Sequence, residues 1–224
     1  GFRPMKVNYS LVDQKAEIEA TQKEVSDFFG GIVPNFVKEG GGILTDTVRF
    51  WRWKNQVNII QKAKEKVEKS GLNKKQVPLK ILLPLIENSA LEEEDLIQEK
   101  WANILANAIT AEKDIKPNYA EILKELSSLE IIILDKLFDE SNKEQDYKKR
   151  RQLQFSKKKI SEIFKLSSEQ ADLIIENLYR LNLCQAPAGH GVVVGEYKFA
   201  LRTTEVFEFT TFGYHFVQSC KWNK

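Results

Sequence analysis

The sequence is poor in the residues from which catalytic and metal sites are usually built. Its 224 residues include two histidines, two cysteines and one methionine. Cys184 and Cys220 are too few for the disulfide framework of a small secreted protein, and they lack the paired spacing of a structural zinc site. We therefore expect no metal, no cofactor and a reducing, cytoplasmic location.

Nor does the sequence contain a motif for nucleophilic catalysis or phosphate binding. His190 lies in an expected loop tip between two glycines, and His215 lies in an aromatic C-terminal segment. Neither has a nucleophile motif around it. Three glycines at residues 40–42 precede a helical pattern, but no Gly-Lys-Ser/Thr or Gly-x-Gly-x-x-Gly motif follows a strand. We interpret these residues as structural and predict that the protein is not an enzyme.

Long hydrophobic runs and an excess of one charge are also missing. The longest apolar stretch, residues 81–86, is far shorter than the ~20 residues that cross a bilayer. Lys plus Arg number 34 and Asp plus Glu number 32, so the net charge of +2 does not predict a nucleic-acid or membrane partner. A membrane is the least expected partner. Residues 1–10 are expected to be disordered or tag-derived, because Met5 is the only methionine and the segment is polar.

Apolar residues recur at helical spacing through residues 11–126. The expected helices cover approximately residues 11–29, 43–70, 78–86, 92–109 and 119–126. In the second of these, residues 43–60 carry two apolar strips and should be buried on most sides, whereas residues 61–70 are mostly charged and should be exposed on most sides. We predict an all-helical N-terminal bundle domain over residues 11–126.

From residue 127 the pattern changes to short helices followed by strands. Ser127-Ser128-Leu129-Glu130 and Ser167-Ser168-Glu169-Gln170 are capping-box sequences. Helices are expected at about residues 127–138, 156–164 and 168–181, then strands, then a short helix from Thr211. A short turn between the second and third helices is typical of a helix-turn-helix. The predicted fold class is mainly α, with a C-terminal winged helix and small β-ribbon over residues 127–224 and a basic loop at residues 143–159.

Positive charge is concentrated between residues 143 and 165, where nine Lys or Arg residues and three acids give +6. Candidate contacts to an acidic partner or nucleic acid are Lys148, Lys149, Arg150, Arg151, Lys157, Lys158 and Lys159. A solvated loop explains the same charge. The expected recognition helix, residues 168–180, has a net charge of −2, which is unsuited to a phosphate-lined groove. We therefore favour protein docking, with nucleic-acid binding as the alternative.

Aromatic residues are concentrated at residues 50–53. Because they point in different directions around a helix, burying all of them requires neighbours on several sides, which a core or a subunit interface supplies. Asn103 and Asn107, at i and i+4, suit a polar strip in such an interface, although solvent-facing positions are more usual. Candidate core or interface residues are Phe50, Trp51, Arg52, Trp53, Asn55, Trp101, Asn103 and Asn107.

Several segments resemble one known family. They are Gly42-Ile43-Leu44-Thr45-Asp46, Arg49-Phe50-Trp51-Arg52-Trp53-Lys54-Asn55, Pro78-Leu79-Lys80-Ile81-Leu82-Leu83-Pro84-Leu85, Trp101-Ala102-Asn103-Ile104-Leu105-Ala106-Asn107-Ala108 and residues 117–126, with a looser match at residues 211–217. In these segments the chain resembles the abortive infection alpha family of bacterial phage-resistance proteins. Lys116-Pro117 stands where relatives are expected to read His-Pro, so no role of that histidine is carried over.

The resemblance implies a role in phage defence and supplies no catalytic residue or cofactor. We therefore predict a non-enzymatic abortive-infection protein that acts through protein–protein contacts or self-assembly. Its partner would be a second copy of the chain or a phage or host component. The alternative is a winged-helix regulator that binds nucleic acid through residues 148–159. An enzyme of unrecognised type and a membrane-active protein stay open as further alternatives.

Overall fold

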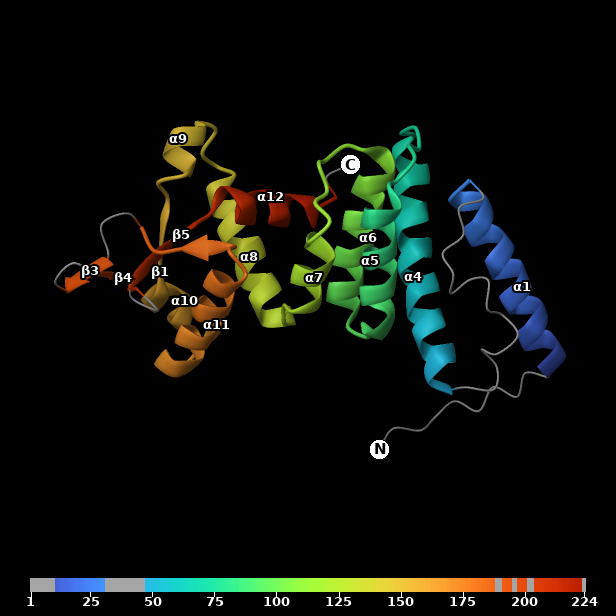
Figure 1. Ribbon diagram of the computed structural model, residues 1–224, viewed down its shortest axis with the longest axis horizontal. Coiled ribbons are helices and arrows are strands. Elements are labelled where there is room, and N and C mark those ends of the chain that lie inside the picture. Colours follow the sequence, from blue (N-terminus) through green and yellow to red (C-terminus); the bar gives the residue numbers. More distant parts are fainter. Residues whose placement is uncertain (1–10, 31–46, 188–190, 195–196, 201–203, 223–224) are drawn as a thin grey trace. The chain divides into compact units, whose positions relative to one another are not determined.

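The computed structural model describes residues 11–30, 47–187, 191–194, 197–200 and 204–222 (Figure 1). Within these residues the chain is mainly helical, with ten α-helices and a small three-stranded antiparallel sheet, which confirms the predicted mainly α class. The predictions for residues 1–10, residues 40–42 and His190 lie outside the described residues. The chain forms two compact units, one reaching Lys124 and including Trp222, the other running from Glu125 to Lys221.

All regular secondary structure described in the first unit is helical. Its elements are α1 (Leu11–Phe28), α4 (Thr47–Ser70), α5 (Leu79–Asn88), the 3-10 turn η1 (Ser89–Leu91), α6 (Asp95–Thr110) and α7 (Tyr119–Lys124). Its core contains Ile59, Ile60 and Ala63 from α4 and Trp101 and Ile104 from α6, each at most 1% exposed. Burying one large aliphatic side chain contributes about 2 kcal/mol, so the contact between α4 and α6 is a major source of stability.

Two side-chain amides of α4 form hydrogen bonds with the end of α5 and the turn after it. Gln56 Nε2 donates to the carbonyl oxygen of Ile86 at 3.1 Å, and Asn55 Nδ2 donates to that of Ala90 at 3.1 Å. The last carbonyls of a helix have no partner within the helix. These two side chains therefore supply donors to the end of α5 and to the η1 turn that follows it.

The prediction that residues 61–70 are exposed on most sides holds only in part. Ala63 and Val67 are buried, and the ammonium groups of three lysines reach neighbouring helices. Lys64 pairs with Glu24 of α1 at 2.5 Å. Charged residues misled the sequence argument because long lysine side chains cover apolar surface while their ammonium groups stay partly hydrated.

The second unit combines short helices with strands. Its elements are α8 (Ser128–Ser141), α9 (Tyr147–Arg150), β1 (Gln154–Ser156), α10 (Lys157–Phe164), α11 (Ser168–Arg180), β2 (Cys184–Gln185), β3 (Gly191–Val194), β4 (Tyr197–Ala200), β5 (Val206–Phe209) and α12 (Thr211–Ser219). Strand β5 pairs antiparallel with both β1 and β2, in the order β1-β5-β2, and β3 pairs antiparallel with β4.

Local sequence signals located the helix starts of this unit well. Both capping boxes are present, with Ser127 and Glu130 at the start of α8 and Ser167 and Gln170 at the start of α11. The predicted loop at residues 143–159 is wrong in part, because it contains α9, β1 and the first turn of α10. Strand β1 was missed because its pairing with β5 is a contact between distant residues. The winged-helix arrangement stays a prediction.

A close backbone approach holds α12 against the chain before β2. A Cβ atom on Gly213 would lie 1.9 Å from the carbonyl oxygen of Leu183. Thr210 fixes the same junction, since its Oγ1 accepts a hydrogen bond from the Gly213 N–H at 2.8 Å and donates to the carbonyl of Asn182 at 2.6 Å. Only glycine fits at this position.

We predict that Gly213→Ala destabilises the protein by about 3 kcal/mol or more, because α12 must move away from a rigid backbone carbonyl. Urea unfolding followed by circular dichroism measures the loss. Gly71→Ala is the control, since Gly71 has φ of +68° and no atom near the added Cβ. It should lose only about 1 kcal/mol from left-handed strain. Equal losses in the two variants would contradict the steric account.

Candidate functional site

The aromatic residues at the start of α4 separate into a buried and an exposed group. Trp53 is 8% exposed and packs with Val57 and with Ile18 of α1, and Phe50 lies partly buried against this cluster. Trp51 is 52% exposed. The expectation that this half of the helix is buried on most sides is therefore wrong on the side of Trp51.

Trp51 lies in a surface that is apolar and basic. Lys54 Nζ is 5.1 Å from the centre of the Trp51 ring, a cation–π distance. Val48 is 63% exposed, and Arg49 and Arg52 are exposed as well. No acidic residue occurs in α4 before Glu65. We call this surface the aromatic-basic patch, defined by Val48, Arg49, Trp51, Arg52 and Lys54.

A second exposed surface of the opposite charge lies beside it. Leu91 is 72% exposed and Leu96 is 37% exposed, and three of the four acids between them, Glu93, Glu94 and Asp95, are exposed too. We call these five residues the acidic turn. Asn55 lies one helical turn after Trp51 on the same face of α4, and its side chain bonds to Ala90, the neighbour of Leu91. The Leu91 end of the acidic turn therefore lies next to the helical turn of α4 that follows Trp51, which makes the two surfaces neighbours at that end.

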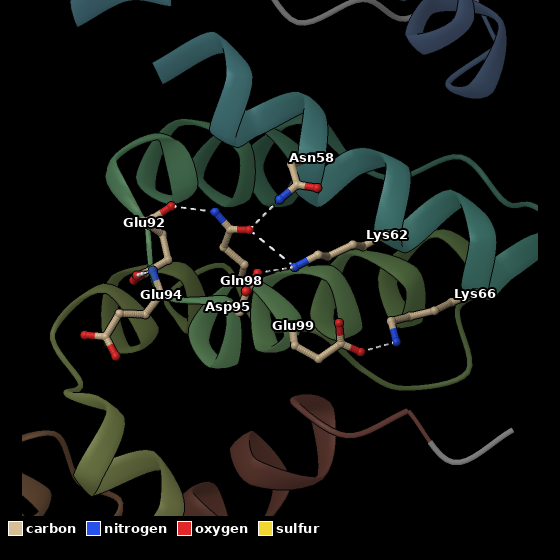
Figure 2. Close-up of polar contacts among 8 residues, drawn as sticks. All are labelled: Asn58, Lys62, Lys66, Glu92, Glu94, Asp95, Gln98 and Glu99. Atoms are coloured by element: carbon tan, nitrogen blue, oxygen red, sulfur yellow. Dashed lines mark hydrogen bonds and ion pairs between the residues drawn. The ribbon is translucent and has the colours of Figure 1, made fainter. Parts of the chain in front are cut away.

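A line of polar contacts between α4 and α6 determines where the acidic turn lies. Figure 2 shows the amide of Gln98 between Asn58, Lys62 and the backbone of Glu92. Gln98 Oε1 accepts from Asn58 Nδ2 at 2.6 Å and from Lys62 Nζ at 3.3 Å, and Gln98 Nε2 donates to the carbonyl of Glu92 at 2.8 Å. Gln98 is 4% exposed, so its amide is buried, and both its oxygen and its nitrogen have hydrogen-bond partners.

Ion pairs extend this line in both directions along α6. Lys62 pairs with Asp95 at 3.1 Å, and Lys66 pairs with Glu99 (Figure 2). Burial raises the pKa of Glu92, while the Glu94 N–H, which donates to Glu92 Oε1 at 2.9 Å, opposes that rise. We call these contacts the polar ladder, formed by Asn58, Lys62, Lys66, Glu92, Asp95, Gln98 and Glu99. Sequence reasoning missed it, although Asn58, Lys62 and Lys66 recur every four residues.

The remaining aromatic and amide candidates lie in the interior of the first unit. Trp101 is 1%, Asn103 6% and Asn107 2% exposed. The usual expectation that Asn103 and Asn107 face solvent is therefore wrong. Their burial is explained by the position of α6, whose residues from Ile97 to Thr110 are nearly all buried.

The candidate cations between residues 148 and 159, here called the basic segment, include both exposed side chains and one that is paired within the unit. Lys148, Lys149, Arg151, Lys158 and Lys159 are exposed. Lys157 instead pairs with Asp172 of α11 at 3.0 Å and with Glu205 at 3.1 Å, and its side chain is 14% exposed. The hydrogen bond to Asp172 raises the pKa of Lys157. Its charge is thus neutralised within the second unit, where it links α10 to α11.

Cysteine and histidine are common nucleophiles and bases in enzymes, but the two cysteines of this chain are buried as structural residues are. Cys184 and Cys220 are free thiols and both are buried. Burial raises the pKa of the Cys184 thiol far above its usual range, which makes it a poor nucleophile. His215 is exposed. In the described part of the chain, no group of three or more His, Cys, Asp or Glu side chains is placed to hold a metal ion, and no helix is both long and apolar enough to cross a bilayer.

We predict that Gln98→Leu lowers the free energy of unfolding by about 2–3 kcal/mol, because it removes the shared acceptor of Asn58 and Lys62 and the donor to Glu92. Urea unfolding measures the change. Gln61→Leu makes the same chemical change at an exposed position of α4 and should be close to neutral. A loss no larger than that of the control would show that the ladder contributes little to stability.

Cys184 should also produce a pH dependence of stability. Its folded pKa lies above the value of about 8.5–9 in the unfolded chain, so its contribution is intact below pH ~8.5 and is lost as the pH rises further. Between about pH 9 and 10, the free energy of unfolding should fall by up to ~1.4 kcal/mol per pH unit through this thiol. Cys184→Ala should remove that part of the slope. Identical slopes for the two proteins would contradict it.

A comparison with known families gives one match. The family model described as abortive infection alpha matches residues 54–220. The matched range includes the whole polar ladder and the described elements from α5 to α12, and it begins just after Trp51 and Trp53. No curated protein and no solved structure matches the chain.

Proposed function

The chain belongs to the abortive infection alpha family, and we propose that it acts in abortive infection by assembling with copies of itself rather than by catalysis. Family membership indicates the abortive-infection role. The proposal of self-assembly is supported by one observation, the adjacency of the aromatic-basic patch and the acidic turn on a single unit.

The two surfaces complement each other in charge and in apolar content. The patch contributes three cations, Arg49, Arg52 and Lys54, and the turn contributes Glu93 and Glu94, beside Asp95, which pairs with Lys62. Each surface also exposes large apolar side chains. When complementary surfaces lie side by side, a two-fold axis brings the patch of each copy against the turn of the other, so both contacts form at once. Exposed Trp and Arg residues are the types that dominate binding energy in such interfaces.

For the second unit we propose a winged helix that docks protein. A three-residue turn separates α10 from α11, as in a helix-turn-helix. On α11, however, the exposed residues include Glu169, Gln170 and Leu173, the last of which is 62% exposed. An acid and an apolar side chain there favour a protein surface over the phosphates of a nucleic-acid groove. Nucleic-acid binding by the exposed lysines of α9 and α10 is the alternative.

We expect Trp51→Ala to convert the assembled protein to monomers and to abolish protection against phage. The free energy of unfolding should change by about 0.5 kcal/mol or less, because the side chain is half exposed. Light scattering on the chromatographic peak gives the mass, and efficiency of plating gives the protection. Leu79→Ala, on α5, is the matched control with 53% exposure.

A charge swap makes the same test specific to the proposed contact. Arg52→Glu and Glu93→Arg should each weaken assembly and protection, and the double variant should regain both. A monomeric wild-type protein, or full protection by Trp51→Ala, would contradict the proposal. A peak whose absorbance at 260 nm reveals nucleic acid that salt removes would favour the alternative.

A further inference from the structure

A depression on the second unit combines two arginines with hydroxyl groups. It is small, with a cavity volume of about 20 Å³, is open to solvent, and lies where α9 meets the end of β5 and the first turn of α12. Its polar lining includes Tyr147, Arg150, Arg151, Thr211 and His215. The basic segment therefore forms one wall of a defined site in addition to its exposed surface.

The guanidinium of Arg150 is held in place by an aromatic stack. Its Cζ lies 4.3 Å from the centre of the Tyr214 ring. That ring is itself fixed, because it stacks on Phe138 with centroids 4.8 Å apart and its hydroxyl donates to Asn142 Oδ1 at 3.0 Å. A guanidinium that stacks on a ring keeps its N–H groups available at its edges.

The opposite side of the depression is formed by interacting side chains of α9, α12 and the residue after α9. The Tyr147 hydroxyl hydrogen-bonds to Thr211 and to Arg151, and these contacts lower the pKa of Tyr147. Thr211 belongs to α12 and Arg151 follows α9, so the three side chains join the two helices. Hydroxyl and guanidinium donors thus line the same small space.

The charge of the lining is entirely positive. Two guanidinium groups line the depression and no carboxylate does. Each acid next to a lining residue already has a partner: Asp146 Oδ1 accepts from the Lys149 N–H at 2.9 Å, Glu140 pairs with Lys143 at 2.9 Å, and Glu208 Oε1 accepts from Gln185 Nε2 at 2.8 Å. A ligand that neutralises this site must bring negative charge with it.

We infer that this depression binds a terminal phosphate group, with Arg150 and Arg151 as ion-pair partners and the Thr211 and Tyr147 hydroxyls as hydrogen-bond partners. Two positive charges match the dianion of a phosphate monoester. The small depression admits one end group and not a continuous phosphodiester backbone. The site goes beyond the proposed self-assembly, because none of its residues belongs to the aromatic-basic patch or the acidic turn.

The test is a titration of the full chain with inorganic phosphate against chloride at constant ionic strength. His215 serves as the probe, because it lines the site and the chain has only one other histidine, which His190→Gln removes. We expect a saturable shift of the His215 ring signals in the nuclear magnetic resonance spectrum. No shift, or one that grows linearly with concentration, would overturn the proposal.

A pair of double variants separates a defined site from general positive charge. Arg150→Gln with Arg151→Gln should weaken phosphate binding at least about tenfold. Lys148→Gln with Lys149→Gln removes the same charge from the adjacent positions, but neither lysine lines the depression. That control should change binding less than about twofold. Equal weakening by both pairs would overturn the assignment. Tyr147→Phe, which keeps both arginines, should still weaken binding if the first pair fails to fold.

Two further ligands identify where the phosphate comes from. A 5′-phosphorylated single-stranded oligonucleotide is compared with the same oligonucleotide ending in a 5′-hydroxyl, each in competition with inorganic phosphate. Competition by the phosphorylated strand alone assigns the site to nucleic-acid ends. Competition by neither assigns it to small phosphomonoesters, and adenosine monophosphate should then compete. Equal competition by both strands would overturn the preference for a terminal phosphate.

Discussion

The buried amide of Gln98 is the constraint on which the first unit depends. An amide removed from water must have its donors and acceptor satisfied, and Gln98 meets this requirement with partners on α4 and in the turn before α6. Apolar packing alone allows two helices to slide relative to each other with little change in buried area. The Gln98 hydrogen bonds do not allow this, because a shift of one turn would separate Gln98 Oε1 from Asn58 and Lys62 of α4.

The register of α4 against α6 also determines which residues are neighbours at the surface. It places the Glu92 backbone near Asn58, while Ala90 lies against Asn55, one helical turn from Trp51. The interior contacts thus explain the adjacency of two oppositely charged surfaces, and the proposed assembly uses that adjacency. In the second unit, Lys157 has the corresponding role. Its pairs with Asp172 and Glu205 join α10 to α11 and to the residue before β5, which leaves the neighbouring lysines at the surface.

The two proposals divide the basic and aromatic residues between different tasks. Trp51 and the cations around it suit a protein contact, because they are exposed and lie next to acids. Arg150 and Arg151 suit a small anion, because one is stacked on Tyr214 and the other contacts the Tyr147 hydroxyl. Positive charge by itself does not distinguish these uses. The difference comes from what each cation touches within its own unit.

The sequence by itself determined the longer helices, most of their starts and the family, but not α9. Capping boxes at Ser127 and Ser167 act over three or four residues, so they can be found without knowing the fold. Only the tertiary structure decided which side of α4 is covered, which lysines are neutralised and where β1 pairs. Lys62, Lys66 and Lys157 have acidic partners 15 to 48 residues away along the chain. Such pairings depend on how the helices pack, and periodicity along the chain does not reveal them.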